Sequence, residues 1–175
     1  MATERPKLQI PLTGFDKVVE ALCWGGLLAL WVAAVLAYRY LPEIIPLHFN
    51  PAGKIDRYGD KVSVLFMPVI PTVLAIGLTF LNRYPHTFNY LEEITAANAE
   101  RNYRMGTRLL RWTKLFMTLI FFSILFMIIK SASKSLSEGE ITHFTNIIIA
   151  AVLLLPVLVL LILILQYRKN KHSHA

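Results

Sequence analysis

The sequence predicts an all-α integral membrane protein with four transmembrane helices, organised as a single membrane domain over residues 1–175. Three observations predict this class. The chain is 55% hydrophobic, and four long blocks are nearly free of charge, as membrane-spanning segments are. A polar, proline-rich segment, residues 41–61, separates the first two blocks. Lys and Arg gather beside the blocks unevenly, in the manner of orientation signals.

The first block predicts a helix over residues 17–38. Glu20 is the only charge near its start, and Thr13 and Asp16 precede it at the spacing of a capping box. The block is longer than the 7–15 apolar residues, roughly, of a cleaved signal peptide, so we expect a retained helix. Tyr38 and Tyr40 then fall at the membrane interface, where aromatic side chains are enriched.

Three further helices are expected over residues 62–81, 96–130 and 146–166. Crossing the hydrocarbon core takes about 20 apolar residues, and the third helix reaches that length with a cytoplasmic extension that begins after Thr95, its expected N-cap. Pro68, Pro71 and Pro156 each remove a backbone donor and predict bends.

The distribution of basic residues predicts that both termini lie in the cytoplasm. Twelve Lys and Arg fall in the two terminal tails and the connection between helices two and three, against six in the other two connections. Basic residues favour the cytoplasmic side. The segment 41–61 and the later loop 131–145 are therefore expected to face outward.

The ionisable residues argue against a pump or a secondary transporter. None lies centrally in a predicted helix, and Glu20, Lys114 and Lys130 are near helix ends, where long side chains reach the interface. No phosphate-binding loop, nucleophile elbow or zinc-binding helix motif is present in the sequence. The net charge is +7, but the Lys and Arg that produce it flank the apolar blocks, so a nucleic-acid partner is not expected. The lipid bilayer is the expected partner. No cofactor is expected.

The outward segment 41–61 is the candidate ligand site, with prolines and glycines that favour an extended and turning backbone rather than a helix. One interpretation is structural: a turn at residues 50–53 with the Asp56 carboxylate accepting from local N–H groups. A second is recognition of an external peptide or protein. A third is a metal held by His48 and Asp56 with His143 from the other loop. The residues proposed to bind the ligand or organise the loop are Pro46, His48, Asn50, Gly53 and Asp56.

Four arginines form a second candidate surface on the expected cytoplasmic extension. Their spacings of 3, 4 and 3 place them within one arc of about 80° on a helix. They fit a solvated stripe at the level of the lipid phosphates, recognition of anionic head groups at about 1 kcal/mol each, or, with residues 84–90, a docking protein. They are Arg101, Arg104, Arg108 and Arg111.

The segment 41–61 resembles a bacterial membrane-domain family catalogued as a domain of unknown function. The residues that carry this similarity are Leu41, Pro42, Ile45, Pro46, Leu47, His48, Phe49, Asn50, Gly53, Asp56 and Lys61. The best-known members are the immunity proteins of the sporulation-delaying-protein toxin system. The resemblance implies a multi-pass protein of the bacterial cytoplasmic membrane, protection from a secreted toxic peptide, and capture of a transcriptional repressor at the membrane. Those longer proteins carry a further multi-helix domain, whereas residues 101–166 are expected to form a short stand-alone hairpin.

The expected function is therefore that of a non-enzymatic membrane protein of sensing or toxin-immunity type, with the segment 41–61 recognising or shaping a ligand site. Two alternatives stay open. One is a structural subunit of a larger complex, in which Gly25, Gly26 and Gly77 line helix interfaces. The other is a metal-dependent membrane enzyme.

Overall fold

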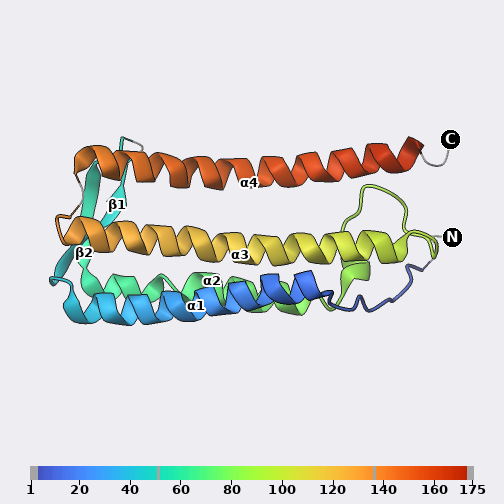
Figure 1. Ribbon diagram of the computed structural model, residues 1–175, viewed down its shortest axis with the longest axis horizontal. Helices are drawn as coiled ribbons and strands as arrows, with labels where there is room; N and C mark the ends of the chain where they lie inside the picture. The colour runs from blue at the N-terminus through green and yellow to red at the C-terminus, as the bar shows by residue number, and fades with distance from the viewer. Residues whose placement is uncertain (1–3, 51, 136, 173–175) are drawn as a thin grey trace.

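The computed structural model describes residues 4–50, 52–135 and 137–172, and in this part of the chain four α-helices run up and down side by side (Figure 1). Both chain ends lie at one end of the bundle, which we call the termini end. A β-hairpin lies at the opposite end, which we call the hairpin end. The helices are α1 (Gly14–Tyr40), α2 (Val69–Leu81), α3 (Ala99–Ala132) and α4 (Glu138–His172).

Three helical stretches of the described chain are long and apolar enough to cross a membrane: Gly14–Tyr40, Lys61–Leu81 and Ala99–Ala132. A shorter apolar stretch, Gly139–Leu154, lies within α4. Large apolar side chains on these helices, such as Leu28 and Val73, are exposed on the outside of the bundle, as they are where lipid surrounds a protein. The chain is thus a mostly helical membrane protein with three to four apolar helices of spanning length.

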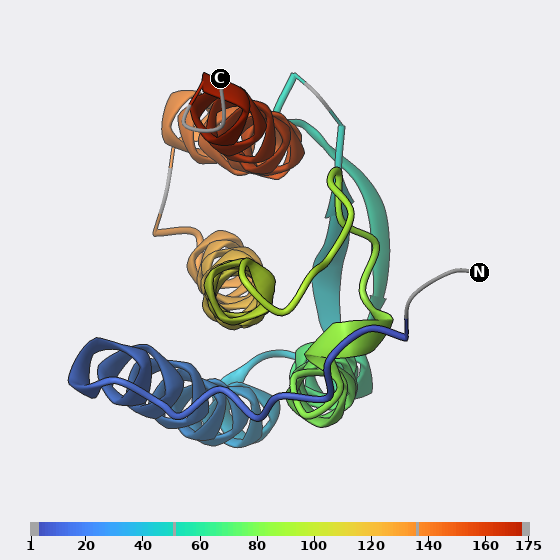
Figure 2. The same ribbon diagram turned by 90° about the vertical axis from the view of Figure 1, so that its right-hand side faces the viewer.

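The expectation of an all-α fold is wrong because the segment between α1 and α2 forms a two-stranded antiparallel sheet. Strands β1 (Ile44–Phe49) and β2 (Ile55–Asp60) pair from Ile44 opposite Asp60 to Phe49 opposite Ile55. Pro46 excludes a helix here and is tolerated because a two-stranded sheet leaves outward N–H groups unpaired. The hairpin extends from α2 across to α4 (Figures 1 and 2).

The start of α1 confirms the predicted capping box. Thr13 Oγ1 accepts from the Asp16 N–H at 3.3 Å, and the Asp16 carboxylate accepts from the Thr13 N–H at 2.9 Å. These two bonds satisfy donors that the first helical turn leaves without partners.

The second predicted helix, 62–81, divides at its prolines. A 3₁₀-helix, η1 (Lys61–Phe66), comes first, and Pro68 forms the N-cap of α2. Pro71 lies in the first turn of α2, where a missing N–H leaves no helical bond unmade. Helix α4 continues through position 156.

The starts of α3 and α4 both differ from the prediction. The N-cap of α3 is Asn98 rather than Thr95, and its side chain makes no capping bond to the helix; its side-chain oxygen instead accepts from the Thr95 N–H at 2.8 Å, which holds residues 95–98 in a turn. Helix α4 begins at 138 rather than 146, so most of the expected loop 131–145 is helical. Ser137 and Glu140 exchange side-chain and backbone hydrogen bonds at its start.

Helix α3 lies between α4 on one side and α1 and α2 on the other (Figure 2). It packs closely on α1 at Gly26, where a Cβ would lie 3.1 Å from the Thr118 methyl group. Around Gly25 and Gly77 nothing lies within 4 Å of that position, so of the three predicted interface glycines only Gly26 faces another helix. The largest apolar cluster joins α1, α3 and the hairpin: Leu30, Ala34, Ala37, Leu41, Ile45, Val64, Leu125 and Ile128.

Candidate functional site

The hairpin has one face in the core and one face outside. Ile45 is fully buried against α1 and α3, with Leu47 and Phe49 half-buried beside it. Ile44 and Tyr58 are about 60% exposed. Alternation along a strand sends successive side chains to opposite faces, so the buried face anchors the hairpin and the other face carries exposed side chains, although Pro46 of β1 is buried.

The turn between the strands depends on Asn50 and Gly53. The Asn50 carbonyl accepts from the Gly53 N–H at 2.8 Å, and its side-chain oxygen accepts from the Lys54 N–H at 3.0 Å. Gly53 has φ +74°, a conformation that favours glycine. The Thr142 hydroxyl donates to the Ala52 carbonyl at 2.8 Å, so the hairpin tip is attached to α4.

His48 and Asp56 form a cross-strand pair, with Nδ1 and Oδ1 2.6 Å apart. About half of each side chain is exposed. The Asp56 carboxylate is thus bonded to the His48 side chain, whereas the structural interpretation expected it to accept from backbone N–H groups. Pro46 lies opposite Tyr58 in the same ladder. The five residues predicted for this site thus fall into a turn (Asn50 and Gly53), a polar pair (His48 and Asp56) and a strand position (Pro46).

The geometry offers little to a metal ion. His143 is exposed on α4, next to Thr142. Within the ranges described, no three His, Cys, Asp or Glu side chains come together in a way that would hold a metal. A convincing site needs three or four ligands, so the pair His48 and Asp56 does not by itself support the metal-dependent enzyme.

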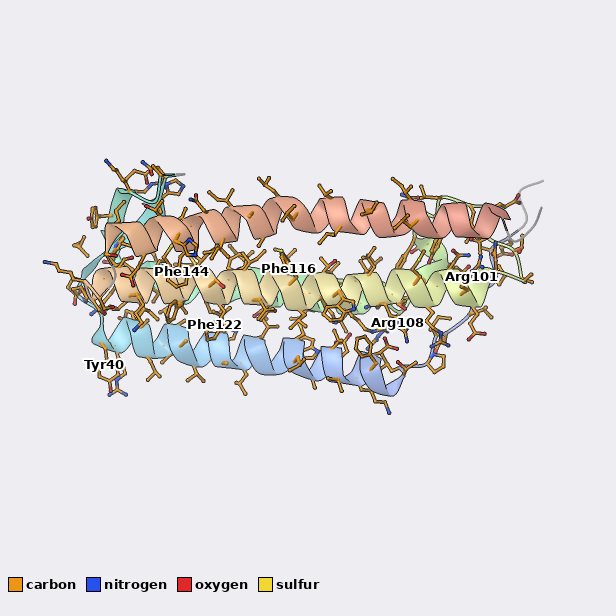
Figure 3. All side chains as sticks on the ribbon, turned by 45° about the horizontal axis from the view of Figure 1, so that its top comes forward. Tyr40, Arg101, Arg108, Phe116, Phe122 and Phe144 are labelled. Carbon is orange, nitrogen blue, oxygen red and sulfur yellow. The ribbon has the colours of Figure 1, made fainter. Side chains whose placement is uncertain are left out.

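The arginine stripe on α3, of which Figure 3 labels Arg101 and Arg108, pairs with several different carboxylates. Arg101 pairs with Glu92 at 3.3 Å, Arg104 with Glu100 at 2.8 Å and Arg108 with Asp16 at 2.9 Å. Arg111 is only 7% exposed. The expectation of one solvated stripe is therefore wrong for Arg111, because the stripe turns into the interface with α1 there.

Next on the same face, Lys114 is completely buried, which corrects the expectation that it extends to the membrane surface. Its ammonium donates to both oxygens of Glu20, each at 2.8 Å, and to Thr79 Oγ1 at 2.7 Å. An ammonium has three donors, and all three are used. We call Asp16, Glu20, Arg108, Arg111 and Lys114 the ion cluster. Sequence reasoning missed it, although Asp16 and Glu20 have the i, i+4 spacing that places them on one face of α1.

The segment 84–90 is already occupied by the N-terminal arm. Arg5 donates to the carbonyls of His86 and Phe88, and its guanidinium lies 5.9 Å from the centre of the Tyr90 ring. Tyr90 donates to the Pro85 carbonyl at 2.8 Å. Burial raises the pKa of Tyr90, and the nearby Tyr103 adds to this, so the hydroxyl stays a neutral donor. These contacts weaken the case for a docking protein here.

Comparisons with known proteins found a family model that matches the region of the hairpin. Residues 25–72, from the middle of α1 through the hairpin into α2, match the family described as "Domain of unknown function (DUF1648)". The chain is similar to an uncharacterised protein of Archaeoglobus fulgidus, with 33% identity over 87 residues, which cover 45% of this chain and 48% of that protein. The chain thus spans about half the length of this curated relative. No solved structure matches the chain.

Proposed function

We propose that the chain is a non-enzymatic membrane protein of sensing or toxin-immunity type, located in the bacterial cytoplasmic membrane with both termini inside. The hairpin would then face outward and recognise an external peptide or protein. Twelve Lys and Arg on the termini side against six on the other support this orientation. The resemblance of the segment 41–61 to the immunity proteins supports the type of function.

The observation that carries the proposal is the way the hairpin is held. Its inner face is part of the apolar cluster of α1 and α3 through Ile45, and its tip is bonded to α4 through Thr142. Its outer face presents a polar pair, His48 and Asp56, and the exposed ring of Tyr58. A ligand bound there would contact a surface that is attached to α1, α3 and α4. Binding that favours one arrangement of the hairpin could therefore shift the positions of these helices, as a sensor would need.

Complementation of a deletion strain tests the proposal. The host lacking this protein is challenged with its own concentrated culture supernatant, and growth and membrane potential are measured. We expect wild-type protein to restore growth and the double variant His48→Ala with Asp56→Ala to fail, because the polar part of the surface is removed. Native mass spectrometry of untagged wild-type protein then identifies a peptide that co-purifies with it and is missing from the variant.

The matched control is Glu43→Gln, which removes the negative charge of the exposed Glu43 from its pair with Lys61 at the base of the same hairpin, away from the outer pair. It should complement like wild type. Full complementation by the His48 and Asp56 double variant would contradict the proposal. Equal loss in the control would show that any change in the hairpin matters, and would remove the assignment to this pair.

A further inference from the structure

The ion cluster at the termini end has one cation more than it has carboxylates. Helix α1 supplies Asp16 and Glu20, and helix α3 supplies Arg108, Arg111 and Lys114. Both oxygens of Glu20 are bonded to Lys114, and Asp16 Oδ1 accepts from Arg108. Among the described residues, the two carboxylates are thus already satisfied by two of the three cations.

Arg111 is the cation left over. Its Nε lies 3.4 Å from Glu20 and its Nη1 3.9 Å from Asp16, and its buried Nε makes no hydrogen bond within the described chain. Yet its side chain is more than nine-tenths buried. A buried guanidinium with five donors and only long ion-pair contacts is costly unless another anion is present.

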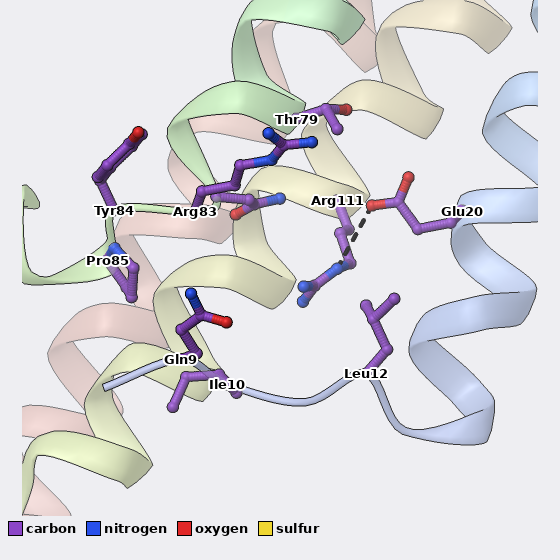
Figure 4. A pocket seen from close by; sticks show the side chains of 10 residues that line it. Gln9, Ile10, Leu12, Glu20, Thr79, Arg83, Tyr84, Pro85 and Arg111 are labelled. Carbon is purple, nitrogen blue, oxygen red and sulfur yellow. Dashed lines mark ion pairs between the residues drawn. The ribbon is translucent and has the colours of Figure 1, made fainter. Parts of the chain in front are cut away.

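A cavity of about 690 Å³ lies directly at this arginine (Figure 4). Helix α2 and the residues after it contribute Asn82 and Arg83, and the N-terminal arm contributes Gln9 and the apolar side chains of Ile10 and Leu12. Both side-chain atoms of Asn82 that can form hydrogen bonds are buried and have no partner in the described part of the chain. The cavity therefore combines two arginines with an unused amide on one wall and apolar groups on another.

We propose that this cavity binds a phosphate-bearing anion, with Arg111 as the main ligand and Arg83 and Asn82 as further donors. The planar guanidinium matches the paired oxygens of a phosphate, and its bonds to an anion are about twice as strong as neutral ones. Glu20 also lines the cavity, but its charge is matched by Lys114. The volume is within the range of small-ligand sites, roughly 300–1,000 Å³, and suits a phosphate with an attached polar group.

Two sources share this chemistry, the head group of an anionic phospholipid and a soluble phosphate ester. The full chain, purified in a neutral detergent and stripped of lipid, is titrated with dioleoylphosphatidylglycerol in one arm and with glycerol 3-phosphate in the other. Native mass spectrometry counts the bound molecules, and tryptophan fluorescence follows thermal unfolding. We expect binding in at least one arm, weakened about 10- to 100-fold by Arg111→Gln, since a hydrogen bond to a charged group contributes about 1.5–3 kcal/mol.

Arg101→Gln is the matched control, because it removes a charge from the same helix but from outside the cavity, and it should bind like wild type. Arg83→Gln is the second variant: this exposed residue can be changed without loss of the fold, and it should weaken binding in the same arm. Binding of the lipid alone identifies a head-group site, and binding of the soluble ester identifies a free-anion site. No binding in either arm, or equal binding by wild type, Arg111→Gln and Arg83→Gln, would overturn the proposal.

Discussion

At the hairpin end, His48 and Asp56 form their hydrogen bond with about half of each side chain exposed, whereas at the termini end a completely buried Lys114 bonds to Glu20, whose side chain is 19% exposed. The difference decides what each pair can do. An exposed pair contributes about 0–1 kcal/mol because water and ions screen it. Breaking a buried pair by removing one partner costs about 3–5 kcal/mol, because a charge is left without compensation. Substitutions of the outer polar groups of the hairpin should therefore change the free energy of unfolding little, while the ion cluster holds α1 to α3.

The largest effect is expected for Glu20→Gln. This change leaves one carboxylate, Asp16, among three buried or half-buried cations, so we expect a loss of about 3–5 kcal/mol in the free energy of unfolding. Denaturant unfolding in detergent micelles, followed by tryptophan fluorescence, measures it.

Lys114→Gln sharpens the same comparison. It leaves two cations, Arg108 and Arg111, facing two carboxylates, with Arg111 Nε already 3.4 Å from Glu20. We expect a smaller loss, about 1–3 kcal/mol, from the hydrogen bonds of the ammonium. If Lys114→Gln destabilised the protein more than Glu20→Gln, the charge count of the cluster would be refuted.

A similar effect is expected at the hairpin tip from Gly53→Ala. The residue has φ +74°, and a Cβ would lie 2.3 Å from the Thr142 Cα, so both the backbone conformation and the packing on α4 are lost. Strain of this kind costs about 1–3 kcal/mol. The same unfolding measurement applies, with Gly25→Ala as control.

Around Gly25 nothing lies within 4 Å of the Cβ position, and alanine is favoured over glycine within a helix by about 1 kcal/mol or less. Gly25→Ala should therefore match wild type or exceed it slightly. Equal losses at both glycines would show that the contact between the hairpin tip and α4 does not contribute to stability.

The smallest effect on stability is expected for His48→Ala. The pair with Asp56 is half-exposed, so its loss should cost less than about 1 kcal/mol. Thermal unfolding of the purified variant gives the value. A loss of more than 2 kcal/mol, on the order of a buried hydrogen-bond partner, would mean that the pair holds the hairpin together, and it would then be unsuited as a variable recognition surface.

Local signals in the sequence predicted parts of this fold well. The Thr13 and Asp16 spacing indicated the capping box of α1, although the helix begins at Gly14 rather than at the predicted residue 17, and Asn50 with Gly53 marked the turn. The strands on either side were missed because Pro46 suggested irregular backbone, and because the ladder itself is irregular around His48. The start of α4 could have been predicted, since Ser137 and Glu140 have capping-box spacing. The polar residues before the apolar run were instead interpreted as a loop.

The ion cluster could not be predicted in the same way. Glu20 and Lys114 are 94 residues apart, and each lies near a helix end, where an isolated charged side chain reaches the membrane surface. Only the packing of α1 against α3, with Thr79 of α2 beside them, brings these groups together. The same packing converts Arg111 from a member of an exposed stripe into a buried cation beside a cavity.

The bond between Thr142 and Ala52 has a mechanical consequence. Among the described side chains of α4, the buried ones are Ile141 and Thr145, both within one turn of that bond, and the apolar side chains farther along are largely exposed. The helix has 35 residues, and the contacts found among its described side chains gather near the hairpin end. At 1.5 Å per residue it is roughly 50 Å long, so a rotation of about 5° at the hairpin would displace its far end by roughly 4 Å.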